Sequence, residues 1–377
     1  MVGDQTIEEL TEDVDSDYTP PHMQDRDVIR AGVMLPFSDR RAGVRNQAEG
    51  MLAGIELALF DHAGEDFVLL PKDTRGSKTT AETMASDLNE QGADFVLGPL
   101  FGTNVTAARN ILAVDDVPVI SFSTDVSVAG AGAWLASIAP EAEVAEIIAY
   151  ASLRGYDQFA FFGADSSLGL RVERAMQYEV SKNGGLMIAS SFYPSDTISP
   201  DVEAASFAAS VERAAARGAR VAVLVPERGN RLRRIAPLLA YHGVDTRLVK
   251  MLGTGAWNDP EVWREPSLNG AWFPSPPQSE MSEFKQRYQR QYGREPSSLA
   301  AVAYDATALA IMLAEDGEIT AEELTNRDGF AGLNGLFRFR FDGTAERSLE
   351  IMEIDPSEET GLKRLRGVAS SFDPSSS

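Results

Sequence analysis

The sequence predicts an α/β protein with two doubly wound lobes, each built on a mostly parallel sheet with helices on both faces. Three observations predict this fold class. The chain has 377 residues, which is long enough for two domains. Its hydrophobic fraction of 44% can supply a core for each of them. Short apolar segments alternate with amphipathic segments along most of the chain, a pattern typical of parallel sheets with crossover helices.

The first half of the chain shows this alternation in order. Each predicted strand is a short apolar run, and each predicted helix carries apolar residues three or four positions apart. The predicted strands are 28–35, 67–70, 95–97, 117–121 and 159–162, and the predicted helices are 48–60, 79–88, 105–113, 144–153 and 171–180.

The second half continues the pattern and then departs from it. Strands are predicted at 187–192, 221–225 and 248–252, with helices at 202–216 and 231–241. Beyond them, two helices follow one another, at 284–292 and 298–313. Segments 337–341 and 349–354 are predicted to form a β-hairpin around Asp342-Gly343, because Asp-Gly is a favoured hairpin turn.

Charge and composition exclude several kinds of function. The chain carries 34 Lys and Arg against 57 Asp and Glu, a net charge of −23, which repels nucleic-acid phosphates and anionic lipid surfaces. It contains no Cys, so disulfides, thiolate nucleophiles and thiolate metal sites are absent. No run of about 18 apolar residues is evident, so no membrane-spanning helix is expected.

The two ends of the chain are predicted to be disordered. Residues 1–27 hold nine acidic residues and one Arg, too polar a mixture to bury a core. They lack the apolar segment of a signal peptide, so the chain is expected either to be cytoplasmic or to have lost its export signal. Residues 368–377 form the second predicted tail.

Residues that would indicate catalysis are scarce. His22, His62 and His242 stand singly, without the paired spacing of metal ligands, so no metal site is predicted. No Gly-x-Ser-x-Gly motif is present, and the Gly253-Thr-Gly255 segment lacks the third glycine of a dinucleotide loop. The sequence therefore predicts no enzyme and no cofactor, although spacing alone does not exclude a Ser–His–Asp triad.

Polar loops follow four of the predicted strands, where ligands bind in open parallel sheets. These loops are 36–39, 98–103, 121–125 and 165–169, and they contribute Ser38 and Ser166 as candidates for a ligand cleft. Each hydroxyl has an alternative interpretation as a helix N-cap. Trp257 lies in a Gly-rich connection, where it could line the cleft or simply pack.

From residue 29 to residue 366 the sequence resembles type I periplasmic binding proteins of the leucine/isoleucine/valine-binding family. The stretches that carry the resemblance include AGVMLPFSDRRAGVRNQAEGMLAGIELAL, GADFVLGPLFGTNV, VPVISFSTD and EFKQRYQRQYGREPSSLAAVAYDATALA. Within that family it looks most like the penicillin-binding-protein activator lipoproteins of alphaproteobacteria, through LFDHAGEDFVLLPKDTRGS, LLAYHGVDTRLVKMLGTGAWNDP and LNGAWFPSPP.

This resemblance implies two lobes joined by a three-strand hinge and closing over a cleft. The implied first lobe comprises 28–140 and 256–338, and the second comprises 141–255 and 339–367. Residues 1–27 would be a tether in a periplasmic protein, anchored to the outer membrane by an N-terminal lipid that this chain does not contain.

The resemblance also implies where an amino-acid ligand would be held. In the first lobe the carboxylate-binding loops correspond to Gly102-Thr103 and Ser123-Thr124, and Gly102 replaces the usual hydroxyl residue. These positions remain candidates for the cleft.

In the second lobe, Leu168 stands where an aromatic residue normally packs on the ligand. Gly255 stands where an acidic residue normally pairs with the ligand ammonium, and Glu227 or Asp259 could compensate. These departures argue against a standard α-amino-acid ligand.

The resemblance implies a non-enzymatic activator of a bifunctional, peptidoglycan-synthesising penicillin-binding protein. The alternative is the solute receptor of an ABC importer, which would deliver an amino acid or a related small polar ligand to a permease. A hydrolase with an unrecognised Ser nucleophile is a third possibility.

Overall fold

The computed structural model describes residues 23, 28–317 and 319–372. The predicted tails at 1–27 and 368–377 therefore lie outside the described residues, except for Met23 and 368–372. The chain forms two compact units, each made of segments distant in sequence. The first comprises residues up to Ser137 and Met281–Glu346, and the second comprises Ile138–Glu280 and the residues from Arg347 onward. The predicted α/β fold with two lobes is confirmed.

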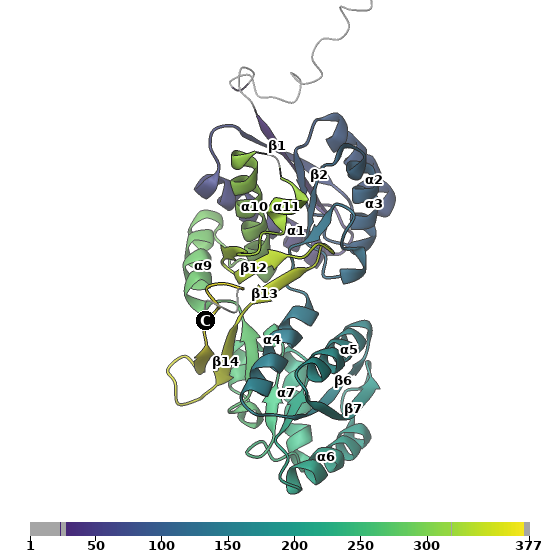
Figure 1. Ribbon diagram of the computed structural model, residues 1–377, viewed down its shortest axis with the longest axis vertical. Helices are drawn as coiled ribbons and strands as arrows, with labels where there is room; N and C mark the ends of the chain where they lie inside the picture. The colour runs from purple at the N-terminus through teal and green to yellow at the C-terminus, as the bar shows by residue number, and fades with distance from the viewer. Residues whose placement is uncertain (1–22, 24–27, 318, 373–377) are drawn as a thin grey trace, which may run out of the picture. The chain divides into compact units, whose positions relative to one another are not determined.

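The first unit contains a parallel sheet of five strands in the order β2-β1-β3-β4-β5. The strands are β1 (Ile29–Leu35), β2 (Phe67–Asp73), β3 (Phe95–Leu97), β4 (Val119–Ser121) and β5 (Ala133–Leu135). Helices α2 (Lys78–Glu90) and α3 (Gly102–Leu112) lie on one side of the sheet, and α1 (Ala42–His62) lies on the other with α10 (Ser298–Asp316) (Figure 1). Strands β1, β3 and β4 are short and almost wholly buried, as the apolar runs predicted.

Additional elements complete the first unit. Helix α9 (Gln278–Tyr292), whose first residues belong to the second unit, packs Phe284 and Tyr288 against α1 and α10. Helix α11 (Ala321–Leu324) precedes a three-stranded sheet of β11 (Phe330–Gly332), β12 (Gly335–Phe339) and β13 (Ala345–Ser348), and the last two residues of β13 belong to the second unit. Two 3-10 turns, η3 (Ala113–Asp115) and η4 (Val126–Val128), flank β4.

One helix among the described residues is apolar and long enough to cross a membrane by length and composition alone. It is the Ser298–Glu315 segment of α10, with a mean hydropathy of 1.4, whereas the sequence predicted no membrane-spanning helix. Most of this segment, 67%, is buried within the protein. Its Asp305 is buried and accepts hydrogen bonds from the backbone N–H groups of Leu333 and Asn334, as suits a core helix.

The second unit contains a seven-stranded sheet in the order β15-β14-β10-β9-β8-β6-β7. The five strands β6 (Gln158–Asp165), β7 (Leu186–Pro194), β8 (Val221–Leu224), β9 (Lys250–Leu252) and β10 (Trp272–Ser275) are parallel. Strand β14 (Glu350–Ile354) is antiparallel to both β10 and β15 (Leu362–Arg366).

Two apolar clusters, one on each face, form the core of this unit. Helices α4 (Pro140–Leu153) and α5 (Ser167–Lys182) contribute to one cluster, and α6 (Asp201–Ala216) and α7 (Gly229–Tyr241) contribute to the other. The short elements η5 (Gly255–Trp257), α8 (Pro260–Trp263) and η6 (Pro266–Leu268) connect β9 to β10.

The observed unit boundaries differ from the predicted ones in three segments, the shortest of which is 138–140, predicted in the first lobe but part of the second unit. Residues 256–280, predicted in the first lobe, belong to the second unit, because β10 pairs with β9 and β14 there. Residues 339–346, predicted in the second lobe, belong to the first unit, where β12 is followed by β13 in the small sheet.

The predicted hairpin was wrong in its second strand. The chain does turn at Asp342-Gly343, with Gly343 at φ +79°, but β12 neighbours β13 rather than β14. The polar sequence of β13, AERS, gave no strand signal. Strand β14 is almost wholly buried, and it lies inside the second sheet with Phe273 opposite Met352.

Candidate ligand-binding site at the carboxyl ends of the strands

Polar loops of the first unit follow β1, β2, β3 and β4. Because these strands are parallel, their carboxyl ends lie along one edge of the sheet. Ser38, after β1, is exposed, and its hydroxyl donates a hydrogen bond to the carboxylate of Asp73 at the end of β2. The backbone N–H of Ser38 donates to the same carboxylate at 3.2 Å. The candidate Ser38 therefore already has a partner in its own lobe.

An ion pair between the buried Asp39 and the exposed Arg41, which the sequence did not predict, organises this edge. Asp39 is 6% exposed and accepts two hydrogen bonds from the Arg41 guanidinium, at 3.0 and 2.9 Å, and one from the Arg41 backbone N–H at 2.8 Å. These bonds lower the pKa of Asp39 to about 2. The Arg41 guanidinium also lies over the ring of Phe101, 5.1 Å from its centre. The pair links the loop after β1 to the loop after β3.

Gly102 and Thr103 begin helix α3. A Cβ at Gly102 would lie 3.0 Å from Oδ2 of Asp125, so a larger residue would require the Asp125 carboxylate to move. Thr103 is exposed in the first helical turn, and its hydroxyl donates a hydrogen bond to Oδ1 of Asn104 at 3.4 Å. Thr124, in the loop after β4, is also exposed.

Ser123 is 4% exposed and participates in the structure of its own loop. Its hydroxyl oxygen accepts from the backbone N–H of Asp125 at 3.1 Å, and its own N–H donates to the hydroxyl of Ser121 at 3.0 Å. The predicted pair Ser123-Thr124 is therefore divided between a buried structural hydroxyl and an exposed one.

The second unit presents its own loops at the carboxyl ends of β6, β8 and β9. Ser166 is the N-cap of α5, where its hydroxyl accepts from the N–H of Gly169 at 3.0 Å, in agreement with the capping alternative. Leu168 follows on the first turn and is 47% exposed. A leucine there offers apolar contact without the flat face of an aromatic ring.

Glu227 and Trp257 belong to a buried network after β8 and β9. Glu227 is 9% exposed, and its carboxylate accepts from the hydroxyl of Tyr193 and lies 3.5 Å from Nε of Arg231. The indole N–H of Trp257, which is fully buried, donates to the carbonyl of Glu227 at 3.1 Å. Burial, reinforced by Glu227, raises the pKa of Tyr193. Trp257 therefore packs in the core of this unit, and Glu227 is held by Tyr193 of β7 and Arg231 of α7.

Gly255 faces the carboxylate of Glu143, a residue that the sequence did not indicate as a site residue. Its backbone N–H donates to Glu143, in the first turn of α4, and a Cβ at position 255 would clash with the Glu143 carboxylate. Glu143 thus fills the space of the side chain that Gly255 lacks. Burial raises the pKa of Glu143 to about 7. Among the described residues, no ion pair joins Glu143 to a Lys or Arg.

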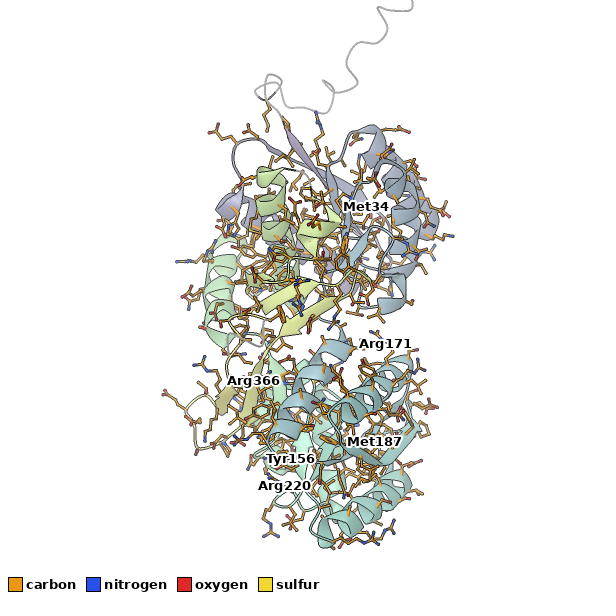
Figure 2. All side chains as sticks on the ribbon, in the orientation of Figure 1. Met34, Tyr156, Arg171, Met187, Arg220 and Arg366 are labelled. Atoms are coloured by element: carbon orange, nitrogen blue, oxygen red, sulfur yellow. The ribbon has the colours of Figure 1, made fainter. Side chains whose placement is uncertain are left out.

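Neighbouring ion pairs fix the start of α4 and therefore the place of Glu143. Arg171 of α5 donates two hydrogen bonds to the Glu141 carboxylate, at 2.8 and 2.7 Å. Arg366 of β15 pairs with Glu146 one turn further along α4. Figure 2 labels both arginines within the second unit. In sequence, Glu143 looks like one of several acids that favour a helix N-terminus, so no signal distinguished it.

The histidines lie in structural contacts. Nε2 of His62 lies 2.9 Å from the hydroxyl of Tyr304, and Nε2 of His242 lies 3.5 Å from Oδ1 of Asp201. His22 lies outside the described residues. Within the described ranges, no group of three or more His, Asp or Glu side chains is arranged to hold a metal ion.

Two α/β units with ligand-type loops at the carboxyl ends of their parallel strands define the type I periplasmic-binding fold. A family model described as periplasmic binding protein matches residues 28–361. The chain belongs to the periplasmic binding protein family, which is non-enzymatic and whose name implies the periplasm. No curated protein matched the chain significantly in sequence.

Solved structures support the fold. A putative branched-chain amino acid ABC transporter protein from Rhodospirillum rubrum is 18% identical, with a TM-score of 0.76 over 90% of this chain and 100% of the other. LivJ of Streptococcus pneumoniae, in complex with isoleucine, is 17% identical, with a TM-score of 0.59 over 91% and 99%. A solute-binding protein from Rhodopseudomonas palustris, in complex with 3,4-dihydroxybenzoic acid, is 16% identical, with a TM-score of 0.62 over 93% and 100%. At these identities the similarity concerns the fold.

Proposed function

We propose that this chain is a periplasmic solute-binding protein whose ligand carries a positively charged group held by Glu143. The single observation that carries the proposal is the Glu143 carboxylate against Gly255, desolvated and without a Lys or Arg partner among the described residues. The Glu143 side chain is partly buried, and desolvation of its carboxylate without a countercharge is costly, so a ligand ammonium would supply the missing charge.

The position of Glu143 weakens the argument that this chain lacks an acid for the ammonium group of an amino-acid ligand. The acid missing at position 255 argued against such a ligand, but the Glu143 carboxylate occupies the space next to Gly255. Similar proteins are described with leucine and isoleucine, and another with a benzoic acid that has no ammonium.

A thermal-shift screen tests the proposal with matched pairs of ligands, such as leucine and 4-methylpentanoate, which differ in the ammonium. A ligand at about 100 times its Kd stabilises the protein by about 2.7 kcal/mol, a readily measured shift. We expect shifts for ammonium-bearing members only, and Glu143→Gln should weaken binding by about tenfold or more. Glu203→Gln, a change at another helix start in the same unit, is the matched control. Flat melting curves, or equal binding by Glu143→Gln, would contradict the proposal.

A second candidate function is activation of a bifunctional penicillin-binding protein. Its support is the narrower sequence resemblance, together with the hydrogen bonds that occupy the Ser38, Ser123 and Ser166 hydroxyls within their own units. A biosensor measurement with the bifunctional synthases of the source organism, coupled to a glycan-polymerisation assay, tests it. Absence of binding and an unchanged polymerisation rate would eliminate this candidate.

A further inference from the structure

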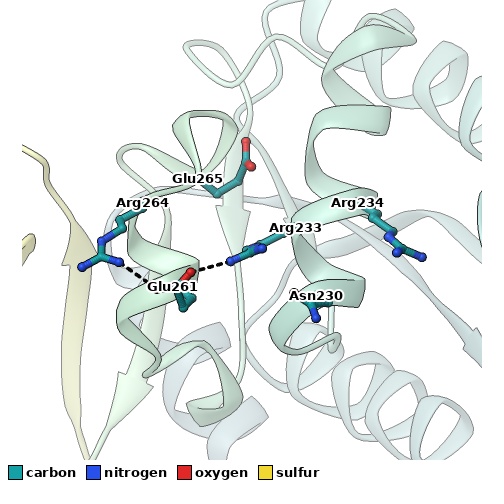
Figure 3. A pocket seen from close by; sticks show the side chains of 6 residues that line it. All are labelled: Asn230, Arg233, Arg234, Glu261, Arg264 and Glu265. Atoms are coloured by element: carbon teal, nitrogen blue, oxygen red, sulfur yellow. Dashed lines mark hydrogen bonds and ion pairs between the residues drawn. The ribbon is translucent and has the colours of Figure 1, made fainter.

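The second unit contains a polar hollow formed by helices α7 and α8 and the segment that follows α8. Its volume is about 480 Å³. Figure 3 shows the six side chains that line it: Asn230, Arg233, Arg234, Glu261, Arg264 and Glu265. All six are polar or charged, so the hollow does not suit an apolar ligand. None of them is a candidate residue of the site at the strand ends.

The hollow presents arginines from two sides. Asn230, Arg233 and Arg234 are three and four positions apart on α7, so they share one face of that helix. Glu261 accepts a hydrogen bond from Nη1 of Arg233 at 2.8 Å and another from Nη1 of Arg264 at 2.7 Å. In Figure 3 these two arginines approach Glu261 from opposite sides. The shared carboxylate therefore orients two guanidinium groups, each of which keeps further N–H donors.

The charges in the hollow are not balanced. Three arginines face two glutamates, an excess of one positive charge in a chain of net charge −23. Glu265 is engaged elsewhere, because its Oε1 accepts from the backbone N–H and the hydroxyl of Ser267 at 3.1 and 2.8 Å. Arg234 is exposed and has no hydrogen bond or ion pair with any described residue.

We propose that this hollow is a second binding site, for a small anion that carries carboxylate or phosphate groups. The hollow is open to solvent, since the Glu261 and Arg264 side chains are 58% and 75% exposed, so the anion would bind at the surface of the unit. The guanidinium fork matches the oxygens of both anions. Arg234 is the primary contact, since its charge is not neutralised by a neighbour. Arg233 and Arg264 add donors from either side, and the Asn230 amide adds a neutral one.

The proposal predicts opposite effects from two substitutions. Arg234→Gln removes the primary contact and should weaken anion binding by about tenfold. Glu261→Gln removes the competing carboxylate and should tighten binding, because Arg233 and Arg264 become available to the ligand. A purely structural role for the Arg233–Glu261–Arg264 network predicts no tightening.

Calorimetric titration of the full chain with inorganic phosphate and with citrate, at low ionic strength, tests the proposal. Saturable binding of either probe is expected, and the comparison of the two probes identifies the preferred anion. Arg217→Gln, an exposed arginine at the end of α6 in the same unit, is the matched control and should leave the affinity unchanged. No binding at millimolar probe, or equal losses for Arg234→Gln and Arg217→Gln, would overturn the proposal. Because Arg234 makes no hydrogen bond or ion pair with the described residues, its variant should keep the wild-type melting temperature, which separates lost binding from lost folding.

Discussion

Glu143 is the residue on which the proposed function depends. It touches the backbone of Gly255, and its burial raises its pKa to about 7. An ordinary surface glutamate would be fully ionised well below that pH. The fold therefore maintains a carboxyl group that is only partly ionised near neutral pH and that gains from a positively charged neighbour.

The pKa of Glu143 predicts how stability depends on pH. The folded state holds the Glu143 proton more tightly than the unfolded state, so this group favours folding at low pH, and its contribution is lost as the pH rises from about 4.5 through about 7. The shift corresponds to at most about 3 kcal/mol. Glu143→Gln should therefore gain stability relative to wild type as the pH rises, in urea unfolding at pH 5 and pH 8. An equal difference between the two proteins at both pH values would contradict the assigned pKa.

The sequence placed most of the candidate residues correctly in relation to the strands but did not establish their roles. Loops after predicted strands identified Ser38, Thr103, Ser123 and Ser166, because parallel strands end at one edge. Whether each hydroxyl faces solvent or its own loop depends on partners such as Asp73 and Gly169. The contact between Glu143 and Gly255 joins segments distant in sequence, so no local pattern could predict it.

At the scale of elements, the crossing of α1 and α10 shows how closely two helices pack in the first unit. A Cβ at Gly54 would clash with the carbonyl oxygen of Ala300. The two helices and α9 also share an apolar cluster, to which α1 contributes Ala53 and Leu57 and α10 contributes Tyr304. Small residues at the crossing allow the backbones to approach, and the long apolar helix α10 is buried as a result.

Gly54→Ala should destabilise the protein by about 1–3 kcal/mol, because one methyl group must push the two helices apart. Gly43→Ala, at the exposed start of the same helix with nothing within 4 Å, should instead stabilise it by about 0.5–1 kcal/mol through helix propensity. Denaturant unfolding of the two variants checks both signs. Similar effects of the two substitutions would contradict the close approach of α1 to the Ala300 carbonyl at Gly54.

Helices and buried strands were predicted better than the elements near the carboxyl end. Strand β13 was missed because its AERS sequence is polar, and β14 was given to the wrong partner because its pairing with β10 spans a long stretch of chain. The local sequence Asp342-Gly343 correctly predicted a turn. The partner of β14 depends instead on its burial in the second sheet, which the local sequence does not show.

At the scale of the molecule, each unit is completed by a segment from the carboxyl-terminal part of the chain. The second unit takes β14 and β15 from residues beyond Glu346, and the indole N–H of Trp272 donates to Glu353 of β14 at 2.8 Å. Three of the four tryptophans, Trp257, Trp263 and Trp272, belong to this unit. Tryptophan fluorescence therefore reports mainly on the second unit.

A chain that ends at Glu346 should lose the second unit selectively, because Ile351, Met352 and Ile354 leave its core. We expect a red-shifted tryptophan emission without denaturant, together with a partial loss of helical circular dichroism. A chain that ends at Phe372 is the control and should match the full chain. Unchanged emission in the shorter chain would show that β14 and β15 are dispensable for the second unit.

The central claim is that Glu143 pairs with a positively charged ligand group. Calorimetric titration at pH 7, in two buffers of different ionisation enthalpy, tests it with the ligand found in the thermal-shift screen. Because the pKa of Glu143 is about 7, pairing with a cation should release a fraction of a proton per bound ligand, and Glu143→Gln should release none. Binding heats that do not differ between the buffers, or equal proton release by wild type and Glu143→Gln, would contradict the claim.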